Sequence, residues 1–169
     1  MLGTVYQEIQ FPNYTVNLYL HIVSMVILLI LLVINIYMYT ITKTDPILLE
    51  VKEKYKRLRE ELKSTGDKKF TMLHNEIPIV AYRQMNANLL GVGYNSNKGQ
   101  EIGICLDGTA NEVFHILLHE LAHCTVKVYK HNKEFWDNYN TLKNMSISIG
   151  IYEAIPRRTP FCGRKISDS

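Results

Sequence analysis

The chain contains little cysteine and shows no internal repeat or low-complexity tract. Cys105, Cys124 and Cys162 are the three cysteines among 169 residues, and none of them belongs to a CxxC pair. An odd number without that spacing argues against a disulfide framework and favours a reducing compartment. We interpret Cys124 as a core residue and Cys162 as a structural or free thiol; an inhibitory contact of Cys162 with a metal site is the alternative.

Charge is absent from Ile9 to Thr42, and all 19 lysine and arginine residues follow this tract. Its apolar core, residues 18–36, would extend about 28 Å as a helix, close to the thickness of the hydrocarbon layer of a membrane. We therefore predict a short exposed N-terminus over residues 1–17 and a transmembrane helix over residues 18–42. A cleaved signal peptide fits poorly, because no basic segment precedes the apolar run.

The basic residues after this helix predict its orientation. Five of them lie between Lys43 and Arg57, within the range where the positive-inside rule acts. The N-terminus should then face outwards or into a lumen, and the following domain should face the cytoplasm. From Gly66 onward the chain has 12 Lys and Arg against 10 Asp and Glu. This small excess makes nucleic acid a poor candidate partner.

Residues 43–65 predict a charged helical stalk. Glu50/Lys54 and Glu53/Arg57 are four residues apart in the order that stabilises a helix. Apolar residues repeat at near-heptad spacing along the segment: Leu48, Val51, Tyr55, Leu58 and Leu62. Self-association through this stripe and a solitary solvated helix are equal alternatives.

The next part of the chain predicts strands. Ile77–Tyr82, Leu89–Tyr94 and Gln100–Leu106 have strand character, and Asn95–Gly99 is a turn cluster. A small antiparallel sheet of three or more strands would offer an edge strand. An extended peptide can add to such an edge through main-chain hydrogen bonds.

The stretch from His119 to His123 reads His-Glu-Leu-Ala-His, which is an HExxH motif. Residues four apart on a helix lie on one face, so both histidines can aim a nitrogen at one metal ion. Zinc suits such ligands and lowers the pKa of a bound water to about 7. Glu120 can take the proton, which is the chemistry of a metallopeptidase.

Residues around the motif predict the helix that carries it. Thr109 and Glu112 have the spacing of a capping box, which starts a helix. An apolar stripe follows at helical spacing: Phe114, Leu117, Leu121, Cys124 and Val128. His119, Glu120 and His123 do not belong to this stripe. A following helix is predicted from Asn132 to about Gly150.

His131 is the predicted third ligand. A continuous helix would carry it about 12 Å along the axis from His123, so the helix must end and the chain must turn back. Glu134 is the alternative ligand. His115 lies four residues before His119, and a row of three such side chains is too long for one ion. We interpret His115 as a residue beside the ligands.

The histidine motif, seven intervening residues, His131 and then Phe135-Trp136 resemble the signature of WLM/SprT-like zinc metallopeptidases. The resemblance is closest to the small membrane-anchored forms encoded by large DNA viruses of eukaryotes. It implies one zinc ion per chain and a zincin-like fold, with Phe135 and Trp136 packed near the site. Tyr129-Lys130 stands where many cellular members have a Gly-Pro turn.

The ligands and the base carry over by position in that resemblance: His119, His123 and His131 would bind zinc, and Glu120 would be the catalytic base. By analogy, the membrane would be a viral inner membrane, with the domain in the virion interior and capsid proteins as candidate partners.

The sequence as a whole predicts an α+β chain in which residues 66–169 form a zinc metallopeptidase-like domain with a basic C-terminal tail. Its substrate would be a protein or peptide. The oxyanion of the reaction needs a further donor, for which the candidates are Tyr129, Tyr139, Tyr152 and His115. The alternative is a structural virion protein that zinc stabilises and that tethers the capsid or another partner to the membrane.

Overall fold

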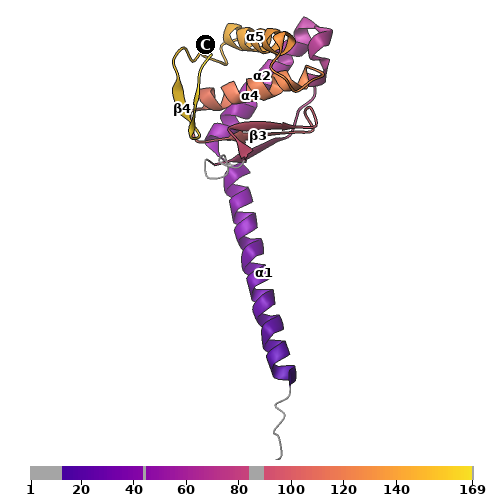
Figure 1. Cartoon of the computed structure of the whole chain (residues 1–169), viewed down its shortest axis with the longest axis vertical. Coiled ribbons are helices and arrows are strands. Elements are labelled where there is room, and N and C mark those ends of the chain that lie inside the picture. Colours follow the sequence, from indigo (N-terminus) through magenta and orange to yellow (C-terminus); the bar gives the residue numbers. More distant parts are fainter. Residues whose placement is uncertain (1–12, 44, 84–89, 169) are drawn as a thin grey trace, which may run out of the picture. The chain divides into compact units, whose positions relative to one another are not determined.

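The computed structural model of the chain describes residues 13–43, 45–83 and 90–168. These residues divide into two compact units, one ending at Ile41 and one beginning at Thr42. Helices and small sheets are combined (Figure 1), as the predicted α+β class requires. Most of the predicted N-terminal segment, residues 1–12, lies outside the described residues.

The described part of the first unit is the helix α1 (Asn13–Lys43) as far as Ile41. Residues Asn17–Thr40 are long and apolar enough to cross a membrane, and none of this stretch is buried. Every leucine and isoleucine between Leu18 and Ile36 is at least 50% exposed. Residues 13–41 of this unit therefore form no core in which these side chains could be buried. Its position agrees with the span predicted over residues 18–42.

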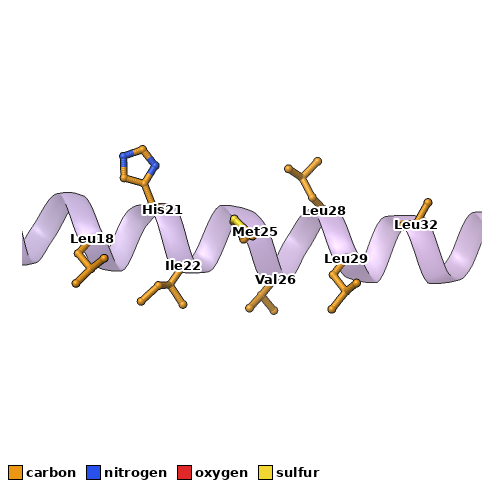
Figure 2. Close-up of a pocket in the computed structure, with 8 residues that line it drawn as sticks. All are labelled: Leu18, His21, Ile22, Met25, Val26, Leu28, Leu29 and Leu32. Atoms are coloured by element: carbon orange, nitrogen blue, oxygen red, sulfur yellow. The ribbon is translucent and has the colours of Figure 1, made fainter.

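Polar side chains of α1 form hydrogen bonds within the helix. Ser24 Oγ donates to the carbonyl oxygen of His21, and Asn35 Nδ2 donates to that of Leu31, both at 2.9 Å. In Figure 2, His21 stands among apolar side chains that project from both sides of this one helix. The hollow that they outline is lined by α1 alone. Helix α1 thus offers an apolar surface and no enclosed ligand site.

The second unit begins with α2, Pro46–Thr65. The Asp45 side chain caps it by accepting from the backbone nitrogen of Ile47 at 2.9 Å, and Gly66 ends it in the left-handed conformation. The apolar stripe of α2 is at most 3% exposed and belongs to the domain core: Leu48, Val51, Tyr55, Leu58 and Leu62. The prediction of a separate stalk over residues 43–65 is therefore wrong. Because the stripe packs inside the domain, it is not available to a second copy.

The strands β1 (Ile79–Tyr82), β2 (Gly93–Ser96) and β3 (Glu101–Cys105) form a sheet in the order β1-β3-β2. The predicted antiparallel pairing holds for β2 and β3, whereas β1 is parallel to β3. A short turn joins β2 to β3 and forces them antiparallel. Strand β1 instead pairs with the other edge of β3, so no tight turn constrains its direction. Leu89, the predicted start of the second strand, lies outside the described residues.

Helix α4 (Ala110–Cys124) lies between the sheet and α5 (Lys133–Ser148), as Figure 1 shows. Helix α2 also packs against α4, and the short 3-10 helix η1 (Lys68–Leu73) contacts both. Neighbours on several sides bury 12 of the 15 residues of α4. The helix that carries the HExxH motif is therefore the central element of the domain.

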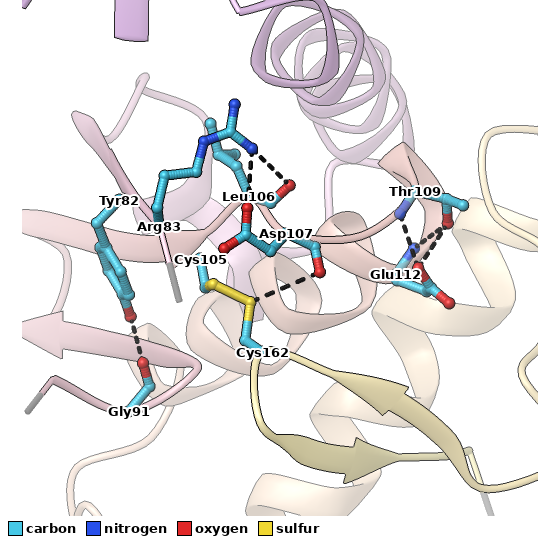
Figure 3. The surroundings of a disulfide bond; sticks show 9 residues. All are labelled: Tyr82, Arg83, Gly91, Cys105, Leu106, Asp107, Thr109, Glu112 and Cys162. Atoms are coloured by element: carbon cyan, nitrogen blue, oxygen red, sulfur yellow. Dashed lines mark hydrogen bonds and ion pairs between the residues drawn. A yellow bond between two sulfur atoms is a disulfide. The ribbon is translucent and has the colours of Figure 1, made fainter. Parts of the chain in front are cut away.

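The C-terminal segment predicted as a basic tail is folded. Strands β4 (Thr159–Phe161) and β5 (Arg164–Ile166) form an antiparallel hairpin. Cys162 in its turn forms a disulfide with Cys105 at the end of β3, as Figure 3 shows. The prediction that the cysteines form no disulfide is wrong, because the fold joins two residues 57 positions apart. Cys124 is the free cysteine and is buried, as predicted.

Candidate metal centre

Helix α4 begins at the predicted capping box. Thr109 Oγ1 accepts from the backbone nitrogen of Glu112 at 3.3 Å, and the Glu112 carboxylate accepts from the backbone nitrogen of Thr109 at 2.7 Å. These two bonds satisfy donors that a helix start leaves without partners. They fix where α4 starts, and therefore which of its residues face the sheet and which face α5.

Three histidine nitrogens meet at one point beside α4. The Nε2 atom of His131 lies 3.0 Å from that of His119 and 3.1 Å from that of His123. Tetrahedral zinc with Zn–N bonds of about 2.0–2.1 Å places its nitrogen ligands roughly 3.3 Å apart. The observed spacing is close to this value, and the three nitrogens could hold one metal ion. The alternative ligand Glu134 does not belong to this group.

The segment between the two helices returns His131 to the site without glycine or proline. Helix α4 ends at Cys124, and the Lys98 ammonium donates to the carbonyl oxygens of Val126 and Lys127. Asn132 then caps α5, because its side chain accepts from the backbone nitrogen of Phe135 at 2.9 Å. Lys98, in the β2–β3 turn, thus holds in place a segment that contains no glycine or proline.

Aromatic rings enclose the histidines on the side of α5. The ring centroid of Phe135 lies 5.0, 4.5 and 4.6 Å from those of His119, His123 and His131. Trp136 lies 5.7 Å from His131. Such packing restricts the rotation of the imidazoles and excludes water from one side of the group. Phe135 and Trp136 therefore pack beside the histidine rings.

Burial keeps two of the histidines neutral. Burial lowers the pKa of His119 to about 3 and the pKa of His123 to about 4, and the neighbouring imidazoles add to both shifts. A neutral imidazole has a free electron pair for a metal ion, whereas a protonated one has none. At neutral pH these two side chains are therefore ready to bind a cation.

The side chain of Glu120, on α4, lies close to the edge strand β2. The side chain is buried, and burial raises its pKa to about 7. A Cβ atom placed on Gly93 would lie 3.0 Å from Glu120 Oε1 and 2.4 Å from Ile116 Cγ2. Asn95 Nδ2 donates to the carbonyl oxygen of Glu120 at 2.8 Å. Gly93 and Asn95 thus hold the edge strand close to the carboxylate of Glu120.

A buried network occupies three of the four candidate oxyanion donors. The hydroxyls of Tyr139 and Tyr152 donate to the two carboxylate oxygens of Asp168, at 3.0 and 2.6 Å. His115 Nδ1 lies 2.9 Å from the Tyr152 hydroxyl oxygen and 3.2 Å from that of Tyr139. Since both phenol protons go to Asp168, His115 Nδ1 must be the donor in these contacts.

Burial sets the ionisation of this network. It raises the pKa of both tyrosines, with a contribution from the Asp168 carboxylate, and lowers the pKa of His115. Burial alone would raise the pKa of Asp168, but hydrogen bonds from Tyr152 and the Ile155 backbone nitrogen lower it. Asp168 is therefore a carboxylate at neutral pH. Sequence reasoning missed this residue, because nothing near it in the chain distinguishes it from an ordinary terminal aspartate.

Tyr129 is the remaining candidate donor. Its hydroxyl oxygen accepts from the backbone nitrogen of Lys98, and its ring centroid lies 5.9 Å from that of His123. Within the described part of the chain, no acceptor for the Tyr129 hydroxyl proton is found. Among the four candidate donors, Tyr129 is therefore the one whose hydroxyl proton has no acceptor among the described residues and can be donated to a ligand.

A second group of ligand-type residues does not form a metal site. The ligand atoms of Cys105, Asp107 and Cys162 lie within 4.8 Å of one another. The two sulfur atoms are joined in the disulfide, so they have no thiolate to offer a metal ion. This also removes Cys162 as an inhibitory ligand of the histidine site while the disulfide is intact.

The chain matches the model of a known family. The WLM domain matches residues 60–159, which are 100 of the 169 residues and include the three histidines and Glu120. Comparisons with curated proteins and with solved structures found no match. The match begins within α2, in agreement with the packing of that helix into the domain. The chain belongs to the WLM domain family.

Proposed function

We propose that this protein is a membrane-anchored zinc endopeptidase. The observation that carries the proposal is the meeting of three histidine nitrogens: the Nε2 atoms of His119 and His123 lie 3.0 and 3.1 Å from that of His131. Glu120, next to His119 in the chain, is buried. Membership of the WLM domain family is consistent with a metallopeptidase-like function. The donor set, three imidazoles, suits zinc better than a hard cation such as Mg²⁺, which prefers oxygen ligands.

Glu120 would act as the general base and then as the general acid. A bound zinc ion would supply Lewis acidity, polarising the scissile carbonyl and acidifying the attacking water. Glu120 would take a proton from that water and give it to the leaving amine. A carboxyl group with a pKa near 7 exchanges a proton readily at neutral pH. Tyr129, which keeps its hydroxyl proton, is our candidate for stabilising the oxyanion.

The edge strand β2 would bind the substrate backbone. Strand β2 is at one edge of the sheet among the described residues, and Gly93 lies against the Glu120 carboxylate. A peptide added to this edge would form main-chain hydrogen bonds with β2. Its scissile bond would then pass beside Glu120. Recognition through main-chain atoms places few restrictions on sequence, so side-chain pockets must provide the selectivity.

Helix α1 would anchor the domain to a membrane, as its exposed apolar residues and its internal hydrogen bonds suggest. The lysines and arginines that follow it favour a cytoplasmic domain, or the equivalent virion-interior side if the protein is viral. The anchor would keep the protease on one membrane surface and limit it to substrates that reach that surface.

Replacing Glu120 distinguishes an enzyme from a structural zinc protein. Full-length protein in detergent would be loaded with zinc and tested on a peptide mixture, with cleavage sites read by mass spectrometry. Glu120→Gln should keep its zinc and lose cleavage by at least about 100-fold, the scale of a general base. Equal cleavage by both proteins would contradict the assigned role, and no cleavage by zinc-loaded wild type would favour the structural alternative.

A further inference from the structure

A cleft of about 500 Å³ opens beside the histidines on the side of the C-terminal hairpin. One wall is the start of β2 with Gly93, and a second is α4 with His119 and Glu120. The third wall is basic and comes from the C-terminal segment: Arg158, Arg164 and Lys165. The cleft therefore continues from the proposed catalytic residues to a group of cations.

The three basic side chains of this wall have no carboxylate partner among the described residues. Asp168 is close in sequence, but its oxygens are engaged by Tyr139, Tyr152 and Lys143. Glu120 is the one carboxyl group among the described residues that line the cleft. Three like charges at one wall repel each other, and an anionic ligand would relieve this repulsion.

The basic wall is held in place from two directions. The disulfide between Cys105 and Cys162 joins the turn of the hairpin to the end of β3. Beyond β5, Asp168 accepts hydrogen bonds from Tyr152 and from the Ile155 backbone nitrogen, both at 2.6 Å. Because the hairpin is fixed at its turn and beyond β5, Arg164 and Lys165 line the cleft as part of the folded domain.

We propose that this cleft binds an acidic side chain of the peptide substrate, an aspartate or glutamate next to the scissile bond. The inference rests on the proposed peptidase function and names its substrate class. Arginine suits this role because its planar guanidinium can donate two hydrogen bonds to one carboxylate. The main chain of the substrate would lie on β2, and its acidic side chain would point to Arg158, Arg164 and Lys165.

Matched peptides test the preference. Zinc-loaded full-length protein in detergent would be given pairs of peptides that differ only by Asp or Asn beside the cleavage site. The Asp peptide should have a kcat/KM at least about tenfold higher, the scale of one charged hydrogen bond. Arg158→Ala and Arg164→Ala should reduce this ratio. Arg157→Ala is the matched control, because Arg157 is an exposed neighbour that does not line the cleft.

Binding provides a readout that does not need catalysis. The Glu120→Gln protein would be titrated into fluorescent Asp and Asn peptides, and anisotropy would report their affinities. The inference predicts that the Asp peptide binds more tightly than the Asn peptide and that Arg164→Ala removes this difference. This result supports the inference even if no peptide is cleaved. In that case only the proposed peptidase function fails. Equal affinity and equal cleavage of both peptides overturn the inference and leave the function intact. Arginine-dependent binding to phosphatidylserine vesicles without any peptide preference would also overturn it.

Discussion

A chain that begins at Asp67 lacks α2 and should not fold. Burial of one large apolar side chain contributes about 1.5–3 kcal/mol, so the five buried residues of α2 contribute about 8–15 kcal/mol as an upper estimate. Domains of this size have a net stability of about 5–15 kcal/mol. Loss of α2 therefore removes most or all of the margin. A chain that begins at Thr42 keeps α2 and should fold.

Two point variants of α2 make the same test without truncation. Leu58 is 0% exposed, so Leu58→Ala should lower the free energy of unfolding by about 2–5 kcal/mol. Leu49 is on the same helix and 53% exposed, so Leu49→Ala should change it by about 0.5 kcal/mol or less. The pair changes the same residue type on the same helix and differs in burial.

Urea unfolding would measure these effects, followed by the fluorescence of Trp136, the one tryptophan of the chain. The expected order of midpoints is wild type, Leu49→Ala slightly below it, and Leu58→Ala far lower. If the chain from Asp67 unfolded cooperatively at the wild-type midpoint, or if both point variants behaved alike, α2 would be a separate stalk and the packing argument would be wrong.

Three further predictions concern the site and the disulfide. Gly93→Ala puts a Cβ 2.4 Å from Ile116 Cγ2. Relief of this clash should shift Glu120 or β2 by about 1 Å and lower kcat/KM by roughly 100-fold, with zinc retained. Unchanged kinetics would show that β2 does not approach α4 this closely. In metal-free protein, the pKa of Glu120 is about 7 in the folded state and 4.5 in the unfolded chain. Between these two pH values the folded protein therefore keeps a proton on Glu120 that the unfolded chain has already released. Its stabilisation is present below that window and is lost as pH rises through it, so the stability of Glu120→Gln relative to wild type should increase by roughly 3 kcal/mol from pH 4 to pH 8 in thermal melts; a flat difference would contradict the buried position. The Cys105–Cys162 disulfide closes a loop of 57 positions, so its reduction should lower the free energy of unfolding by about 4 kcal/mol. If the domain is cytoplasmic, alkylation in intact cells should label both thiols. Protection from alkylation would place the domain in an oxidising compartment.

Local patterns in the sequence predicted the elements that position the site. The capping box at Thr109 and the helical spacing after it located α4, and the cap at Asn132 located the start of α5. Both rest on contacts within four residues, which a single sequence displays directly. The need for the chain to turn back before His131 also followed from helix geometry alone.

Long-range contacts could not be predicted in the same way. The near-heptad stripe of α2 has the same appearance whether it packs on a second copy or on α4. The parallel pairing of β1 depends on which edge of β3 is free, and the disulfide depends on a hairpin 57 positions from Cys105. Asp168 likewise gains its role only because the C-terminal segment folds back towards Tyr139 and Tyr152.

The central claim is that three histidines hold one zinc ion, and metal content tests it most directly. Full-length protein purified in detergent, together with His131→Ala and the control Lys130→Ala, would be measured by mass spectrometry for zinc and by circular dichroism for folding. We expect about one zinc per chain in wild type and Lys130→Ala, and loss or strong weakening of binding in His131→Ala. A folded wild-type protein that takes up no zinc would contradict the metal site and the peptidase function built on it.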